Sequence, residues 1–228
     1  MITRQQALEA LQGQLIVSAQ AYPGEPMRDP RTMAGVAASA VRGGAAAVRV
    51  QGLGDVQATR SAVEVPVIGL WKDGAEGVFI TPTFQHAYAV ALAGAHVVAV
   101  DGTRRPRPDG LSLEQTTARL HEETHALVMA DCGSLADARH AADAGADLVG
   151  TTLAGYTGER APTDGPDLGL VQEIRRAELG VPLVAEGRIH TPAQAAAARQ
   201  AGADAVVVGT AITHPSTITS WFAEVLQD

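Results

Sequence analysis

The stretch SLADARHAADAGADLVGTT, residues 134–152, places a helix, the end of that helix and a strand in direct succession. Ser134 is a favoured residue at the start of a helix, and the alanine-rich segment Leu135–Ala144 has helical composition. Gly145 predicts the end of the helix, because glycine readily adopts the left-handed conformation found there. The apolar run Asp147–Thr152 has the composition of a strand buried on both faces. The stretch therefore predicts one helix-to-strand connection of an α/β protein.

The same connection recurs along the chain. The triplet Ala-Gly-Ala occurs at residues 93–95, 144–146 and 201–203, each time between an alanine-rich segment and an apolar run. Gly43-Gly44-Ala45 is a looser copy. Apolar runs that alternate with helical segments at this spacing predict repeated βα units and a parallel sheet.

Eight apolar runs qualify as strands. They are expected at Leu15–Ala19, Ala45–Val50, Val67–Trp71, Ala95–Asp101, Ala126–Asp131, Asp147–Thr152, Pro182–Glu186 and Ala205–Val208. Eight βα units within residues 1–228 predict a single-domain TIM (β/α)8 barrel with short loops. A doubly wound open sheet is the structural alternative, but no Gly-x-Gly-x-x-Gly sequence follows an early strand.

Composition narrows the classes of partner. The formal net charge is −8 and no basic cluster occurs, which argues against nucleic acid or an anionic membrane as a partner. Cys132 is the only cysteine, so an internal disulfide is excluded and a reducing, cytoplasmic setting is expected. No apolar run approaches the length of a membrane span, and the first residues lack the apolar segment of a secretory signal.

Polar residues gather at the expected ends of the strands. In a TIM barrel the active site is built at the carboxyl ends of the strands, so these positions are the candidates. They are Gln20, Arg49, Lys72, Asp101, Asp131, Thr151, Thr152, Glu186, Arg188, Gly209 and Thr210. Any one of them can be an ordinary residue of the barrel rim. Several ionisable groups at one mouth indicate a function, because burial of unpaired charge is costly.

Lys72 and Glu186 form the most specific pair. Lys72 is the only lysine beside sixteen arginines, and a buried lysine, unlike an arginine, can lose its proton and act as a base. The two residues are expected at the ends of the third and seventh strands, on opposite sides of the ring. An amine and a carboxyl on opposite faces of a substrate suit proton transfer at a carbon next to a carbonyl, with inversion there. The alternative is a Lys–Glu ion pair that only braces the barrel.

Glycines after the last two strands predict an anion site. Gly187 lies between Glu186 and Arg188, and Gly209-Thr210 follows the eighth strand. Barrels of this class commonly hold a phosphate on backbone N–H groups of these two loops. Thr152 and Arg188 are expected to contact the rest of the substrate.

The sequence offers no metal site. The histidines have no metal-ligand spacing and are interpreted as surface or packing residues, and Asp131 lacks the further carboxylates that magnesium prefers. Cys132 has no histidine partner at a recognisable spacing and is expected to be a buried thiol. No cofactor is therefore expected.

Several motifs together resemble the N-acylglucosamine-6-phosphate 2-epimerase family, also called the N-acetylmannosamine-6-phosphate 2-epimerase family. They cover nearly the whole chain: IVSAQA at 16–21, PGEP at 23–26, VFITPT at 78–83, DGTRRP at 101–106, GTTLAGYT at 150–157, AEGRI at 185–189 and GTAIT at 209–213. Two features depart from the family pattern. His214 stands where an arginine is common, and the loop 73–77 lacks an expected aromatic residue. The arginine- and proline-rich segment 102–110 has no assigned role.

The resemblance implies roles for the candidate residues. It implies Lys72 as the catalytic base and Glu186 as its acid partner. Gln20, Arg49 and Asp131 would hold the sugar hydroxyls and the N-acetyl group. Gly187, Gly209 and Thr210 would bind the phosphate.

The function expected from these implications is cofactor-free epimerisation at C2 of N-acetylmannosamine 6-phosphate to N-acetylglucosamine 6-phosphate, in amino-sugar and sialic acid catabolism. Glu186 acts either as the opposite-face acid or in ring opening, and a homodimer is expected at the level of the family. Another phosphate-binding TIM-barrel enzyme, or a sugar-phosphate sensor without turnover, is the alternative.

Overall fold

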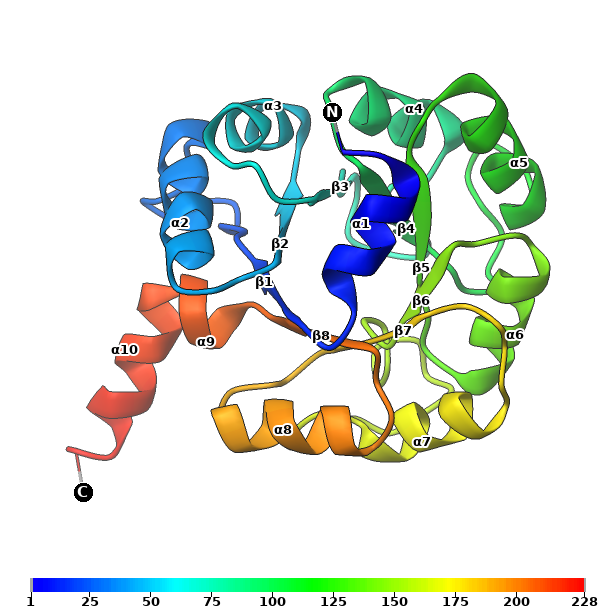
Figure 1. The fold of residues 1–228 in the computed structure, drawn as a ribbon. Coiled ribbons are helices and arrows are strands. Elements are labelled where there is room, and N and C mark those ends of the chain that lie inside the picture. Colours follow the sequence, from blue (N-terminus) through cyan, green and yellow to red (C-terminus); the bar gives the residue numbers. More distant parts are fainter. Residues whose placement is uncertain (1, 228) are drawn as a thin grey trace.

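The computed structural model describes residues 2–227 and contains a closed barrel of eight parallel strands (Figure 1). The strands follow one another around the barrel in sequence order, and the eighth pairs with the first. They are β1 Leu15–Ser18, β2 Ala47–Gln51, β3 Val67–Leu70, β4 Val97–Asp101, β5 Leu127–Asp131, β6 Leu148–Gly150, β7 Leu183–Glu186 and β8 Ala205–Val208. The TIM-barrel prediction is confirmed, and closure of the sheet excludes the doubly wound alternative.

Helices surround the barrel on the outside (Figure 1). They are α2 Pro30–Arg42, α3 Leu53–Ala62, α4 Phe84–Leu92, α5 Leu113–Glu123, α6 Leu135–Asp143, α7 Leu168–Arg176 and α8 Pro192–Gln200. Three further helices lie outside the regular repeat: α1 Arg4–Leu11, α9 Thr210–Thr213 and α10 Pro215–Glu224. The side chains of Ala7 and Leu11 join the apolar core inside the barrel, so α1 covers the amino-terminal end of the strands.

The helix-to-strand connections have the predicted form. The Ser134 hydroxyl accepts a hydrogen bond from the Asp137 backbone N–H and caps α6. Gly94, Gly145 and Gly202 have φ angles of 108°, 83° and 113°, in the region that favours glycine. Each connection therefore turns tightly from a helix into the next strand.

A segment after Lys72 is inserted between β3 and β4. These strands share only two residue pairs, Ile68 with Val97 and Gly69 with Val98. Beyond them Ile80 forms an antiparallel bridge with Lys72 and accepts a hydrogen bond from the Asp101 N–H at 2.9 Å. Lys72 thus stands two residues past the end of β3 and not at its end, because this inserted segment replaces β4 as its neighbour.

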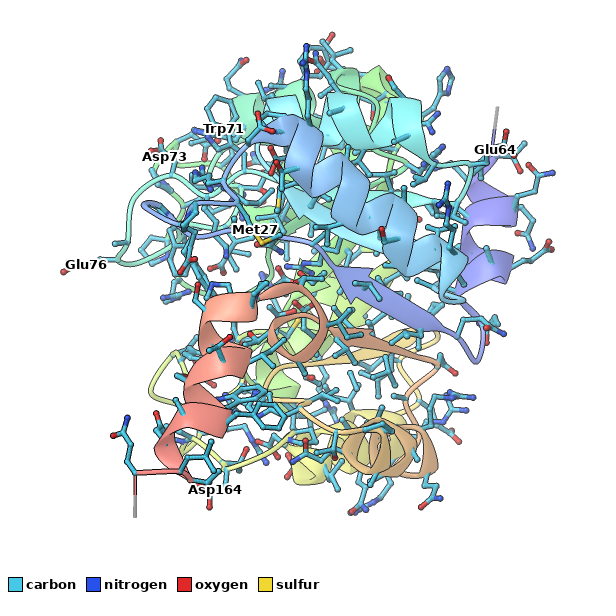
Figure 2. The ribbon with its side chains drawn as sticks, turned by 90° about the vertical axis from the view of Figure 1, so that its left-hand side faces the viewer. Met27, Glu64, Trp71, Asp73, Glu76 and Asp164 are labelled. Atoms are coloured by element: carbon cyan, nitrogen blue, oxygen red, sulfur yellow. The ribbon has the colours of Figure 1, made fainter. Side chains whose placement is uncertain are left out.

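The last helix stands apart from the barrel. Figures 1 and 2 show α10 extending away from the strands, with the end of the chain beyond it. Every residue of α10 keeps part of its surface exposed, and Phe222 is 69% exposed. Among residues 2–227, no helix combines the length and apolar character needed to cross a membrane.

Candidate active site

The predicted polar side chains occupy inward-facing positions of their strands. Side chains alternate along a strand, and in β3 Ile68 and Leu70 belong to the apolar core inside the barrel. Lys72 continues that series beyond the strand end. Corresponding positions on five other strands, or two residues beyond their ends, carry Gln20, Arg49, Asp131, Thr152 and Glu186. The alternation that fills the barrel with apolar side chains therefore directs these polar ones into its carboxyl-terminal mouth.

The mouth contains a cavity of about 460 Å³. Its lining includes Gln20, Arg49, Lys72, Thr152, Glu186, Gly187, Arg188, Gly209 and Thr210, whereas the candidates Asp101, Asp131 and Thr151 lie outside it. Aromatic side chains also line it, namely Tyr22, Phe79 and Tyr156, together with His190 and His214. The cavity therefore joins titratable groups, glycine turns and apolar walls, as a binding site for a small molecule does.

Lys72 enters this cavity as a base candidate. Its Nζ donates a hydrogen bond to the Gln20 side-chain carbonyl at 3.1 Å. Burial lowers the pKa of Lys72, and the nearby Arg49 guanidinium lowers it further. Within residues 2–227 the Glu186 carboxylate pairs with Arg49 and not with Lys72, so the ion pair that would only brace the barrel does not form.

A buried network surrounds Glu186. Arg49 donates two hydrogen bonds to the Asp131 carboxylate, at 3.0 and 2.7 Å, and its Nη1 lies 2.9 Å from Glu186 Oε2. The Thr152 hydroxyl lies 2.7 Å from Asp131 and 3.1 Å from Glu186. The side chains of Arg49 and Asp131 are 2% and 0% exposed. Asp131 therefore lies behind Arg49 and holds it in place.

Glu186 has the opposite electrostatic character to Lys72. Burial raises the pKa of Glu186, and the Asp131 charge raises it further, although Arg49 acts in the other direction. The raised pKa favours the protonated carboxyl, while the lowered pKa of Lys72 favours the neutral amine. A cavity with a neutral base and a protonated acid can move a proton on and off carbon.

The part of the lining that follows β7 and β8 carries the glycine turns. Gly187 has φ 109°, a conformation that L side chains rarely adopt. Gly209 packs closely on Ser18, since a Cβ there would lie 3.3 Å from the Ser18 Cβ. His214 is 7% exposed and its Nε2 lies 3.5 Å from the Glu25 carboxylate. This region thus presents backbone N–H groups and an imidazole beside the cavity.

The Arg188 side chain forms hydrogen bonds within the protein. Its guanidinium donates hydrogen bonds to the backbone carbonyls of Ala154 at 3.0 Å and Gly165 at 3.2 Å, and its Nη2 lies 3.2 Å from the Thr163 hydroxyl. It also stacks against Tyr156, with 5.3 Å between the guanidinium carbon and the ring centre. Arg188 therefore fastens the loop between β6 and α7 at the edge of the cavity.

Sequence reasoning missed some of the lining. Ser18 and Tyr22 line the cavity but were not among the candidates, although they lie in or next to the first-strand motif. His190 also lines it, whereas the sequence predicts a surface or packing residue. His190 does pack, with its ring 4.8 Å from that of Trp221, but it also lines the cavity. The inward alternation starting from Ile16 could have identified Ser18. Cys132 is fully buried, as predicted.

The loop after Lys72 projects outward. Figure 2 shows Asp73 and Glu76 on this loop, with Glu76 extending into solvent. Within residues 2–227, no three His, Cys, Asp or Glu side chains gather in a group that could hold a metal ion.

A closed (β/α)8 barrel whose mouth holds a lysine of lowered pKa and a glutamate of raised pKa in one cavity has the features expected of an enzyme that transfers protons. Comparison with known proteins gives the particular family. The family model NanE, described as "Putative N-acetylmannosamine-6-phosphate epimerase", matches residues 33–228. A relative from Cutibacterium acnes named "Putative N-acetylmannosamine-6-phosphate 2-epimerase" is 58% identical over 221 residues, which cover 96% of each chain. The chain belongs to the NanE family and is an isomerase of the epimerase class.

Solved structures agree with this assignment. The N-acetylmannosamine-6-phosphate 2-epimerase from Clostridium perfringens superposes with a TM-score of 0.91 at 34% identity, over 96% of this chain and 95% of that one. Thiamine phosphate pyrophosphorylase from Pyrococcus furiosus has a TM-score of 0.59 at 19% identity, over 88% of this chain and 87% of that one. The second likeness concerns the barrel fold alone.

Proposed function

We propose that this protein interconverts N-acetylmannosamine 6-phosphate and N-acetylglucosamine 6-phosphate by proton transfer at C2. The observation that supports this most strongly is that one cavity contains both Lys72, whose pKa is lowered, and Glu186, whose pKa is raised. The two epimers differ only in configuration at C2, so one proton removed and one returned completes the reaction. We place the reaction in amino-sugar and sialic acid catabolism, with residues 1–228 as one catalytic domain.

The first half of the reaction creates the acidic carbon. Opening of the sugar ring converts C1 into an aldehyde, which makes the C2 proton removable. The neutral amine of Lys72 takes this proton, and the electron pair of the C–H bond moves into an enolate across C1 and C2 with negative charge on O1. Arg49 is a permanent cation in the cavity, next to Glu186, and stabilises that charge, while Asp131 keeps its guanidinium in place.

The second half returns a proton on the other face. Glu186 comes from β7 and Lys72 follows β3, which lie opposite each other in the ring of eight strands. The protonated carboxyl of Glu186 donates to C2, and the aldehyde and its ring re-form. Exchange with solvent then removes the proton from Lys72 and restores the one on Glu186. Each positioned acid or base contributes about 10²–10⁴-fold to the rate.

The phosphate occupies the region of Gly187, Gly209 and Thr210. Backbone N–H groups of these two turns suit an anion, and the glycines permit its close approach. Gln20 and Thr152 contact sugar hydroxyls or the N-acetyl group from the other parts of the lining. The reaction needs no metal and no nucleotide.

We also propose that two copies of the chain associate through the last helix. Phe222, Val225 and Leu226 are 69%, 71% and 84% exposed, and an apolar surface of this kind favours burial against a partner. Light scattering coupled to gel filtration measures the mass of the particle. Phe222→Glu is expected to give a monomer, and a wild-type monomer at micromolar concentration contradicts the proposal.

The test of function is ¹H NMR of the purified protein with N-acetylmannosamine 6-phosphate. The gluco epimer is expected from the phosphorylated sugar, with full activity after dialysis against a chelator. N-acetylmannosamine without phosphate is the matched control and is expected to react far more slowly. Binding without turnover would identify a sensor, and absence of both would favour another phosphate-binding barrel activity.

A further inference from the structure

Arg107 is a buried cation outside the cavity. It is 8% exposed and comes from the arginine- and proline-rich segment 102–110. Its Nη1 donates a hydrogen bond to the Asp101 backbone carbonyl at 3.0 Å, and its Nη2 donates to the Thr81 backbone carbonyl at 2.8 Å. Both bonded partners are main-chain groups and neither is a carboxylate. Burial of a guanidinium that bonds to no carboxylate is costly even with the charges of Asp101 and Asp109 nearby, so its position needs a reason.

One of the two carbonyl groups that Arg107 binds belongs to a strained residue, Thr81. Thr81 has φ 48° and is fully buried. A β-branched side chain in this left-handed region is a genuine outlier and is strained. Such strain persists only where the surrounding structure fixes it. Arg107 bonds directly to the carbonyl group of this residue and contributes to that fixation.

Thr81 in turn holds the residue before Lys72. Its backbone N–H donates to the Trp71 carbonyl at 2.8 Å, and its hydroxyl accepts from the Trp71 N–H at 3.1 Å. The same hydroxyl donates to the Ala99 carbonyl of β4 at 2.6 Å. Both main-chain groups of Trp71 are thus bound by one residue, and the Trp71 carbonyl belongs to the peptide that leads into Lys72.

The rest of the segment 102–110 anchors Arg107 from both sides. Arg105 lies 2.7 Å from the Asp101 carboxylate, and Asp109 accepts a hydrogen bond from the Phe84 backbone N–H at 2.8 Å, at the start of α4. The segment is therefore tied to β4 before Arg107 and to α4 after it. This arrangement fixes the backbone on both sides of Arg107.

We propose that Arg107 is a positioning residue for Lys72. Arg107 acts through Thr81 and Trp71 to hold the Lys72 amine in the cavity. The chain of contacts runs from the Arg107 guanidinium to the Thr81 carbonyl, and from Thr81 to both main-chain groups of Trp71. The proposal rests on the proposed function only in so far as Lys72 is the catalytic base. The position of Lys72 itself can be measured without substrate.

The single lysine makes that measurement direct. Protein grown with lysine labelled with ¹³C at Cε gives one lysine side-chain signal, because Lys72 is the only lysine. Its chemical shift against pH gives the titration midpoint of Lys72. Arg107→Met is expected to loosen the Trp71–Lys72 peptide, to let the amine reach solvent and to raise the midpoint toward the ordinary value for lysine.

Activity supplies a second readout. A catalytic group that is displaced by about 1 Å can lose about 10²-fold in rate, so Arg107→Met is expected to lower kcat by about that factor and to leave KM unchanged. The limb of the pH profile that reports Lys72 moves up with the Lys72 midpoint. Arg4→Met is the matched control, because Arg4 also donates to a backbone carbonyl, that of Ala126 at 2.8 Å, at the other end of the barrel. It is expected to change stability alone.

A folded Arg107→Met protein with the wild-type Lys72 midpoint and wild-type kcat overturns the proposal. If Arg107→Met does not fold, Thr81→Val decides, since it keeps the shape of the side chain and removes the hydroxyl that binds Trp71. A raised Lys72 midpoint in Thr81→Val supports the proposal, and an unchanged one refutes it. If the midpoint moves in the variants while wild-type protein fails to epimerise the sugar, the positioning role stands and the proposed function fails.

Discussion

Replacement of Asp131 by asparagine tests the electrostatics of the site. Asp131 is fully buried. It accepts two hydrogen bonds from Arg49 and one from Thr152. Its negative charge raises the pKa of Glu186 and also acts to raise the pKa of Lys72. Asparagine has the same shape and no charge, so Asp131→Asn is expected to lower the pKa of both residues.

The pH dependence of kcat/KM measures these pKa shifts. Activity needs Lys72 neutral and Glu186 protonated, so the two limbs of the profile follow the pKa values of these two groups. Both limbs of the kcat/KM profile are expected to move to lower pH in Asp131→Asn. Asparagine can still accept one hydrogen bond from Arg49, so the loss of stability is that of one charge-assisted hydrogen bond, about 1.5–3 kcal/mol.

Asp167→Asn is the matched control. Asp167 forms the same two-bond contact with Arg160, at 2.7 and 3.0 Å, and lies outside the cavity lining. It is expected to lose stability to a similar extent, measured by urea unfolding, with both limbs unmoved. A profile in Asp131→Asn that stays in place, or that moves to higher pH, refutes this account of the electrostatics.

Two other variants separate the roles of the acid and the base. Glu186→Gln is expected to lower kcat by about 10²–10⁴-fold if Glu186 is the opposite-face acid, while deuterium exchange at C2 continues; a weaker loss indicates a role in ring opening. Lys72→Met is expected to raise Tm at pH 7 while activity is lost. Because the pKa of Lys72 is lowered on folding, the unfolded chain binds more protons between that lowered value and the ordinary one, and wild-type stability rises with pH there. The variant should lack this rise. A Tm below that of wild type at pH 7, with the same pH slope, contradicts the assignment.

Local patterns predicted the barrel because each connection is decided by neighbouring residues. The Ala-Gly-Ala triplets end a helix and start a strand through the conformation of one glycine, and this requires no knowledge of distant contacts. The predicted strand positions are confirmed to within two residues at each end. Strand alternation also explains why Arg49, Lys72 and Glu186 converge at the mouth.

The parts that escaped prediction depend on contacts between distant segments. The apolar run before Lys72 predicts a strand to Trp71, but the segment around Ile80 inserts beside it and takes over its pairing. Asp131 lies behind Arg49, and spacing along the chain does not distinguish a side chain in the cavity from one beneath it. Arg107 makes contacts with Thr81, 26 residues away, so composition alone left the segment 102–110 without a role.

The apolar pattern of the last helix did not predict which surface it contacts. Its apolar residues, including Ile218 and Trp221, allowed docking either on the barrel or on a second subunit. In the structure Trp221 contacts His190, while Phe222 and Val225 remain exposed. A pattern of apolar residues predicts that a surface is buried, but the partner that buries it lies outside the sequence of one chain.

Deuterium exchange at C2 tests the central claim most directly. Wild-type protein and Lys72→Arg are incubated with N-acetylmannosamine 6-phosphate in D₂O and followed by ¹H NMR. Arginine keeps a positive charge at this position but does not release its proton in a protein. The account predicts that wild-type protein forms the gluco epimer with deuterium at C2, and that folded Lys72→Arg yields neither epimer nor exchange. Substantial exchange or epimerisation by Lys72→Arg would contradict the assignment of Lys72 as the base.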